Sequence, residues 1–147
     1  MLFERIDRVV TLVPDLEAAE EFFSRVFGLR FDETAVDEDL QLKLVHAGRF
    51  GLELIEPTGD EQPRAASMRK WLQKHGPGFR TIVIKVSDLD AALARLREHG
   101  IEPVGQFALG EAREAFLDPS QTMNISIALN EYPEEHPMTI EGRSAHA

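Results

Sequence analysis

The chain has 147 residues, of which 43% are hydrophobic and 29% charged, a composition typical of one soluble globular domain with a sizeable core. The formal net charge of −10 disfavours nucleic acid or an anionic membrane as a partner, because both attract clustered Lys and Arg. The complete lack of cysteine excludes disulfides, thiolate metal sites and a cysteine nucleophile.

The first residues, M-L-F-E-R-I-D, carry charges where a secretory signal needs an apolar core. No long apolar run follows that would suit a membrane-spanning helix. We therefore expect a cytoplasmic protein.

The first half of the chain predicts a strand, a helix and three further strands. Residues 6–13 form the first strand, and Asp15 is placed to cap a helix over residues 16–27 that Gly28 ends. Three short strands, separated by turn residues, are then predicted over residues 29–35, 40–46 and 50–56.

A connector over residues 57–78 follows, rich in turn residues, with an amphipathic helix through Met68, Trp71 and Leu72. The second half then predicts a strand at 81–86 and a helix at 89–99 that Gly100 stops. Its last three strands are predicted over residues 103–109, 113–117 and 123–129. Residues 130–147 contain two prolines and several Glu, which predicts a tail that is disordered or lies over the surface.

One stretch of sequence occurs twice. R-V-V-T-L-V-P-D-L-E-A-A begins at Arg8 and T-I-V-I-K-V-S-D-L-D-A-A begins at Thr81, 73 residues later. In both copies a β-branched run meets Asp-Leu and continues as an Ala-rich helix, which predicts two copies of one supersecondary unit. We therefore expect a single domain over 1–130, with one module at 6–56, the connector at 57–78 and a second module at 79–130, followed by a tail at 131–147.

Alternation along the strands predicts a sheet with two different faces. One face of every strand is apolar and is expected to pack on the helices. The other face carries mid-strand polar groups, among them Arg8 and Glu53. Such a sheet can curl around a ligand, although the simpler alternative is that its polar face is merely solvated.

This pattern resembles the vicinal oxygen chelate superfamily, which includes glyoxalase I, methylmalonyl-CoA epimerase, extradiol dioxygenases and the bleomycin and fosfomycin resistance proteins. The matching stretches begin with I-D-R-V-V-T-L-V-P-D-L-E-A-A-E-E-F-F, F-G-L-E-L-I-E-P, W-L-Q-K-H-G-P-G-F-R-T-I-V-I-K-V-S-D-L-D-A-A-L and A-F-L-D-P, and together they span roughly residues 6–129. The connector is most similar to the epimerase branch. The resemblance implies an α+β fold of two tandem βαβββ modules, a curled, cup-like mixed sheet with helices on its outer face, and a homodimer.

The superfamily's metal enzymes usually place His, Glu or Gln, His, and Glu at four strand positions, which correspond here to Arg8, Glu53, Thr81 and Ala128. Only Glu53 remains, and one carboxylate does not hold a divalent ion against water. The guanidinium of Arg8 cannot deprotonate and repels a cation. A one-residue slip that put Asp7 in this position would bury Arg8 against the helices. We therefore expect no cofactor and disfavour a divalent metal.

Arg8 and Glu53 are predicted to form an ion pair where the metal enzymes hold their ion. The pair is either a structural salt bridge or a site in which Arg8 binds a ligand's carboxylate or phosphate while Glu53 orients the ligand or moves a proton. Glu53 is thus the candidate catalytic residue. The candidate ligand-binding residues are Arg8, Glu53, Thr81, Lys85, Ser126 and Ala128.

The histidines point mostly to structural roles. His75 and His99 precede glycines at predicted helix ends, where imidazole interacts favourably with the last carbonyl groups. His46 is the one histidine expected near the cup, where with Glu53 it would begin a metal site unlike the superfamily's.

Three functions stay open. The first, which we favour, is a module that binds a small, partly apolar molecule, with or without an anionic group, in the cup without a metal. The second is a lyase or isomerase of the glyoxalase or methylmalonyl-CoA epimerase type with an atypical site. The third is a non-catalytic assembly or regulatory domain.

Overall fold

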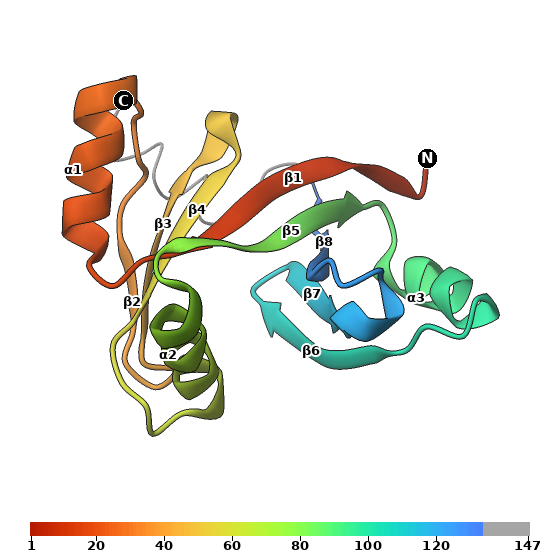
Figure 1. Cartoon of the computed structure of the whole chain (residues 1–147). Coiled ribbons are helices and arrows are strands. Elements are labelled where there is room, and N and C mark those ends of the chain that lie inside the picture. The colour runs from red at the N-terminus through yellow and green to blue at the C-terminus, as the bar shows by residue number, and fades with distance from the viewer. Residues whose placement is uncertain (134–147) are drawn as a thin grey trace.

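The computed structural model describes residues 1–133, in which eight strands form one mixed sheet flanked by three helices. The helices are α1 (Leu16–Phe27), α2 (Pro63–His75) and α3 (Leu89–Glu98). The strands are β1 (Phe3–Leu12), β2 (Ala35–Asp37), β3 (Leu42–Ala47), β4 (Leu52–Pro57), β5 (Gly78–Val86), β6 (Pro103–Leu109), β7 (Ala112–Leu117) and β8 (Ile127–Glu131). Their order across the sheet is β2-β3-β4-β1-β5-β8-β7-β6 (Figure 1).

The sheet consists of two modules with the same order of elements. The first is β1, α1, β2, β3 and β4, and the second is β5, α3, β6, β7 and β8, with α2 as the connector between them. β1 and β5 are antiparallel neighbours at the centre, and each pairs in parallel with the last strand of its own module. The predicted α+β fold of two tandem βαβββ modules in a curled mixed sheet is confirmed (Figure 1).

The helices of the two modules begin in the same way. Oδ1 of Asp15 accepts a hydrogen bond from the backbone N–H of Ala18 at 3.0 Å, and Oδ1 of Asp88 accepts one from Ala91 at 2.9 Å. These aspartates are the N-caps that the repeated Asp-Leu motif predicts, since each satisfies an N–H that has no partner inside its helix.

A glutamate from the last strand of each module adds a second cap. Oε2 of Glu56 on β4 accepts from the N–H of Leu16 at 2.9 Å, and Glu131 on β8 accepts in the same manner from Leu89. A carboxylate at a helix N-terminus also interacts favourably with the helix dipole. The duplication therefore extends to the side chains that tie each helix to its own strands.

Alternation along the strands divides the core between the two faces of the sheet. α1 and α3 pack on one face, where Leu16 contacts the cluster around Leu54 and Leu89 contacts the cluster around Leu129. α2 packs on the opposite face through Met68. The prediction that helices cover an apolar outer face thus holds for α1 and α3, whereas α2 lies on the concave face.

Most elements lie within three residues of their predicted ends, and β2 is the main exception in the first module. It spans Ala35–Asp37 rather than residues 29–35. Leu29 and Phe31 pack with the α1 cluster, so their apolar alternation reflects contact with the helix and not membership of the sheet.

The last strand also differs from the prediction. It begins at Ile127 rather than at residue 123, because Met123 and Asn124 adopt φ values of 58° and 63°, which belong to the left-handed region. It continues through Glu131, and Tyr132 after it is buried. Residues 130 and 131 therefore belong to the sheet and not to a tail, and the rest of the predicted tail, from residue 134, lies outside the described residues.

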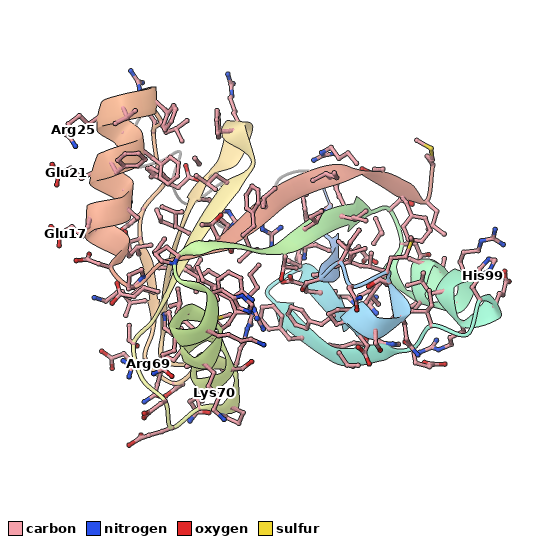
Figure 2. All side chains as sticks on the ribbon, viewed as in Figure 1. Glu17, Glu21, Arg25, Arg69, Lys70 and His99 are labelled. Atoms are coloured by element: carbon pink, nitrogen blue, oxygen red, sulfur yellow. The ribbon has the colours of Figure 1, made fainter. Side chains whose placement is uncertain are left out.

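Charged side chains follow the solvent-facing side of the helices. Glu17, Glu21 and Arg25 succeed one another along α1, and Arg69 points away from α2 (Figure 2). Among the helices in residues 1–133, none is long and apolar enough to cross a lipid bilayer.

The duplicated caps give a test of the fold. We expect Asp15→Ala and Asp88→Ala each to lower the free energy of unfolding by about 1 kcal/mol, because each change leaves a first-turn N–H without its acceptor. Chemical denaturation measures the loss. Asp39→Ala, at an exposed turn position, is the matched control and is expected to change stability little; equal effects at all three sites would contradict the capping role.

Candidate functional site

A cavity of about 710 Å³ lies on the concave side of the sheet, within the size range of small-molecule sites. Strands of both modules and helix α2 form its walls. Its apolar lining includes Leu42, Met68, Trp71, Phe107 and Phe116. Its charged lining residues are Arg8, Asp37, Glu53, Arg64, Arg80 and Glu114.

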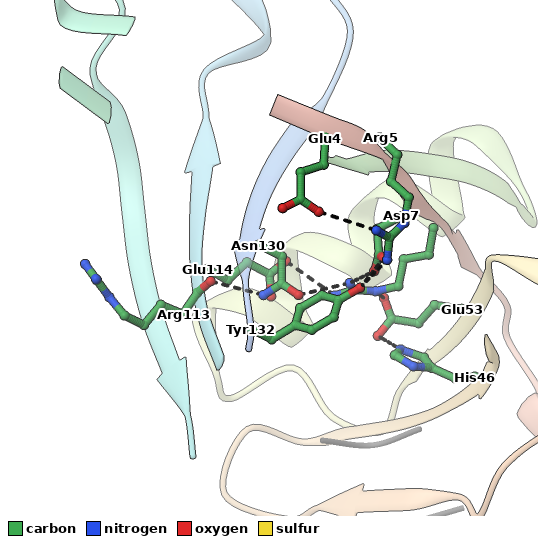
Figure 3. A network of polar contacts seen from close by, with 10 residues as sticks. Glu4, Arg5, Asp7, His46, Glu53, Arg113, Glu114, Asn130 and Tyr132 are labelled. Atoms are coloured by element: carbon green, nitrogen blue, oxygen red, sulfur yellow. Dashed lines mark hydrogen bonds and ion pairs between the residues drawn. The ribbon is translucent and has the colours of Figure 1, made fainter. Parts of the chain in front are cut away.

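Arg8 lies at the floor of this cavity with only 6% of its surface exposed. Its Nε donates to Oε2 of Glu53 at 3.3 Å, and its Nη1 donates to Oδ2 of Asp7 at 3.0 Å and to Oδ1 of Asn130 at 3.3 Å. Nη2 lies 3.9 Å from Oε1 of Glu114. Figure 3 shows these four partners, which come from β1, β4, β7 and β8. The predicted pairing of Arg8 with Glu53 is therefore present, within a larger cluster.

The charged groups of this cluster shift one another's pKa values. Burial disfavours a charged guanidinium, yet the carboxyl groups of Glu53, Glu114 and Asp7 raise the pKa of Arg8 above its usual value. Arg8 is thus a permanent cation with little exposure to water.

Glu53 is held in its ionised form. His46 faces it across the β3–β4 ladder, and Nε2 of His46 lies 2.8 Å from Oε1 of Glu53. Burial alone favours the neutral acid, but Arg8 and His46 outweigh burial and hold the pKa of Glu53 far below its ordinary value. Both carboxylate oxygens therefore already accept a hydrogen bond.

Glu114 is the second carboxyl group at the floor, and its pKa shifts the other way. Burial raises the pKa of Glu114, and the attraction of Arg8 does not cancel this effect. Glu114 faces Asn130 across the β7–β8 ladder. Sequence reasoning missed both residues, although alternation places Asn130 on the same face of its strand as Ser126.

The remaining candidate residues fall into two groups. Thr81 and Ser126 line the cavity, and their hydroxyl oxygens lie 2.9 Å apart, within hydrogen-bond distance. Lys85 and Ala128 are not among the lining residues of this cavity. Nζ of Lys85 instead lies 3.3 Å from Oε2 of Glu4, and Ala128 is fully buried in the core beneath α2.

The histidines lie close to where the sequence places them. His75 is the last residue of α2 and His99 is the C-cap of α3 (Figure 2 labels His99). His46 stands behind Glu53 and is not itself a lining residue of the cavity.

Two further arginines line the cavity. The guanidinium of Arg64, on α2, lies over the rings of Phe107 and Phe116 at 5.6 Å and 5.1 Å from their centres. Burial and the charge of Arg64 lower the pKa of Arg80 on β5. Within residues 1–133 neither arginine forms an ion pair, so both cations are available to an anionic ligand.

The residues at the four ligand positions of the superfamily's metal enzymes do not fit a divalent ion. They present a guanidinium at Arg8, a carboxylate at Glu53 that is already paired, a hydroxyl at Thr81 and a methyl group at Ala128. Across the described chain, no group of three or more His, Asp or Glu side chains is arranged to hold a metal. A cation would instead face the fixed positive charge of Arg8.

The Arg8 cluster gives a stability prediction. We expect Arg8→Met to lower the free energy of unfolding at neutral pH by roughly 3–5 kcal/mol, because it leaves buried carboxylates without their cation. The double variant Arg8→Met/Glu53→Gln is expected to recover part of this loss. Arg49→Met, at an exposed arginine, is the control, and a cost at Arg8 no larger than at Arg49 would contradict the cluster's role.

The same cluster predicts a pH dependence. The folded pKa of Glu53 is depressed, so its contribution is fully present above its unfolded value of about 4.5 and is lost as the pH falls toward the folded value. Wild-type protein should therefore lose stability below about pH 4.5 more steeply than Glu53→Gln. Denaturation midpoints measured across this acid range test the difference.

A family model described as the glyoxalase/bleomycin resistance protein/dioxygenase superfamily matches residues 7–117, more than half of the chain. Mitochondrial methylmalonyl-CoA epimerase of Bos taurus is 28% identical over 132 residues, covering 86% of this chain and 74% of the relative. The corresponding protein of Homo sapiens is 29% identical over 104 residues, covering 69% and 57%.

Solved structures agree with these matches. A variant of Streptomyces coelicolor methylmalonyl-CoA epimerase, in complex with 2-nitronate-propionyl-CoA, has a TM-score of 0.76 at 26% identity and covers 92% of this chain and 99% of its own. Methylmalonyl-CoA epimerase from Mycobacterium tuberculosis has a TM-score of 0.76 at 25% identity and covers 99% and 94%. With its two βαβββ modules around a cavity and this match along the sequence, the chain belongs to the glyoxalase/bleomycin resistance protein/dioxygenase superfamily.

Proposed function

We propose that the protein binds a small, partly apolar, anionic molecule in its cavity without a divalent metal ion. The observation that carries this proposal is the buried guanidinium of Arg8, which lies at the cavity floor among side chains that carry oxygen. Glu53 offsets much of this charge, but Nη2 of Arg8 forms no hydrogen bond within residues 1–133, so a guanidinium donor with little exposure to water remains for an anionic group.

The walls support the same class of ligand. Apolar and aromatic side chains from α2, β6 and β7 supply the surface against which the apolar part of a ligand packs. Arg64 and Arg80 add further positive charge to the lining, which a second anionic group of a ligand can contact.

Acyl-CoA thioesters combine these features, since they join a short acyl group to a carrier with several phosphates. The Streptomyces coelicolor relative is described in complex with 2-nitronate-propionyl-CoA, which is such a molecule. We propose acyl-CoA thioesters as the first ligand class to test, with the acyl group toward Arg8 and the phosphates toward Arg64 and Arg80.

A second candidate is an isomerase of the methylmalonyl-CoA epimerase type, which the similarity to epimerases favours. Metal-free proton abstraction there falls to Glu53, the carboxylate at a superfamily ligand position. Its depressed pKa makes Glu53 a weak base, and both of its oxygens are occupied by Arg8 and His46. Binding is therefore better supported than proton transfer by Glu53.

Ligand binding is testable by thermal unfolding. We expect propionyl-CoA to raise the melting temperature of the protein, because a ligand that binds only the native state stabilises it. The shift should be the same after treatment with EDTA. Stoichiometric divalent metal in purified protein, with binding lost on chelation, would contradict the metal-free proposal.

The arginines supply the matched variants for this experiment. Arg64→Ala and Arg80→Ala are each expected to weaken propionyl-CoA binding about tenfold or more, because each removes a charged hydrogen-bond donor. Arg69→Ala is the control, since Arg69 lies on the same helix as Arg64 but points away from the cavity (Figure 2).

The second candidate has its own test. Incubation of the protein with methylmalonyl-CoA in D₂O should incorporate no deuterium at the carbon next to the thioester beyond the background rate. Mass spectrometry measures the exchange. Incorporation that depends on the protein and disappears in Glu53→Gln would favour the isomerase over the binding module.

A further inference from the structure

Arg8 has one nitrogen that is not fully engaged. Nε and Nη1 donate to Glu53, Asp7 and Asn130, whereas Nη2 has only Oε1 of Glu114 nearby, at 3.9 Å. This distance exceeds that of a hydrogen bond, which for N–H···O lies at about 2.7–3.2 Å. Both Arg8 and Glu114 line the cavity. Both side chains therefore border the space that a ligand would occupy.

Glu114 differs from Glu53 in its surroundings. Glu53 accepts from Arg8 and lies within hydrogen-bond distance of His46, whereas the Glu114 side chain forms no hydrogen bond within residues 1–133 and has only the long contact to Arg8. It is 8% exposed. The charged or titratable groups that act on it are Arg8 on β1, His46 on β3, Glu53 on β4 and Arg64 on α2. Burial outweighs these neighbours and raises the pKa of Glu114, which favours its acid form.

We propose that Nη2 of Arg8 and the carboxylic acid of Glu114 together bind one anionic oxygen of the ligand, as two converging hydrogen-bond donors. An oxygen about 2.9 Å from each group fits between two atoms 3.9 Å apart. This inference rests on the proposed function and names the chemical group recognised: the oxygen of a planar anion such as a carboxylate or a nitronate. Glu114 is then a ligand-binding residue that no superfamily ligand position supplies.

The register of the sheet explains how the acid reaches this place. Ala128, at the superfamily's fourth position, faces Phe116 across the β7–β8 ladder, and the next inward-facing pair is Asn130 with Glu114. The second module thus contributes its carboxyl group from β7 and not from β8. Glu114 lies two residues before Phe116, the ladder partner of Ala128. The two modules place Glu53 and Glu114 against different nitrogens of the same guanidinium, with only Glu53 in direct hydrogen-bond contact.

The proposal requires a proton on Glu114 and so predicts a pH dependence of binding. As the pH rises through the pKa of Glu114, the donor becomes a carboxylate that repels an anionic oxygen, and affinity falls. Glu114→Gln keeps a donor of the same size without this titration, whereas Glu114→Ala removes the donor. If Glu114 had only a structural role, the pH dependence of affinity would be the same for ligands with and without the anionic group.

Isothermal titration calorimetry with two probes separates these possibilities. The first probe is 2-nitronate-propionyl-CoA, which carries an anionic group next to the thioester, and the second is propionyl-CoA, which lacks it. Wild-type protein, Glu114→Gln, Glu114→Ala and the control Glu111→Gln, at an exposed turn position, are titrated from acid to alkaline pH. Ionisation of the probe affects all variants alike, so each profile is read as a ratio to Glu114→Gln.

We expect Glu114→Ala to weaken nitronate binding about tenfold to hundredfold, the range typical of a charged hydrogen bond, and to leave propionyl-CoA binding nearly unchanged. Wild-type affinity for the nitronate should fall with rising pH relative to Glu114→Gln, and Glu111→Gln should follow wild type. Equal nitronate affinities and parallel pH profiles in all four proteins, with both probes bound, would overturn this inference alone. Failure of wild-type protein to bind either probe would overturn the proposed function and this inference with it.

Discussion

The buried guanidinium of Arg8 is the interaction on which the rest of the site depends. It lies on a central strand and contacts side chains from β4 of the first module and from β7 and β8 of the second. Removing a charge from water costs several kcal/mol in a protein interior, so Arg8 is tolerable only because oxygens surround it. The same oxygens are fixed in place by Arg8, and the cavity floor is therefore one cooperative unit rather than a set of separate pairs.

The two modules share a fold but contribute different chemistry to this floor. Their helices are capped by equivalent residues, Asp15 and Asp88, which shows how closely the local structure repeats. At the cavity the equivalence ends, because Arg8 of the first module corresponds to Thr81 of the second. The first module supplies the cation and an ionised carboxylate, and the second supplies a carboxyl group whose pKa is raised. The two modules therefore contribute groups of different charge to the cavity floor, which identical copies would not do.

The sequence predicted the elements whose signals are local and missed features that depend on tertiary contact. Period-two alternation placed Arg8 and Glu53 on the concave face, and Asp-Leu followed by alanines marked both helix starts. The apolar stripe of α2 predicted that one side of this helix is buried. It did not indicate on which face of the sheet the helix packs. The second module was predicted to end at residue 130, one residue early, because the left-handed residues before β8 shift that strand along the chain. The sequence around Glu114 does not distinguish it from a solvent-exposed strand residue. Its position at the cavity floor depends on Arg8 and Asn130, which are distant in the sequence.

A guanidinium at the cavity floor recognises ligands differently from a divalent ion. A divalent cation with open coordination positions can take up two adjacent oxygens of a ligand and exchange them for water. The donors of Arg8 are directional, and most are already used by Asp7, Glu53 and Asn130. One nitrogen remains for a ligand, so the proposed recognition of an anionic oxygen uses a second donor from the protein. A chain that keeps the fold but holds its positive charge on a side chain is thus expected to select ligands by the placement of a single oxygen.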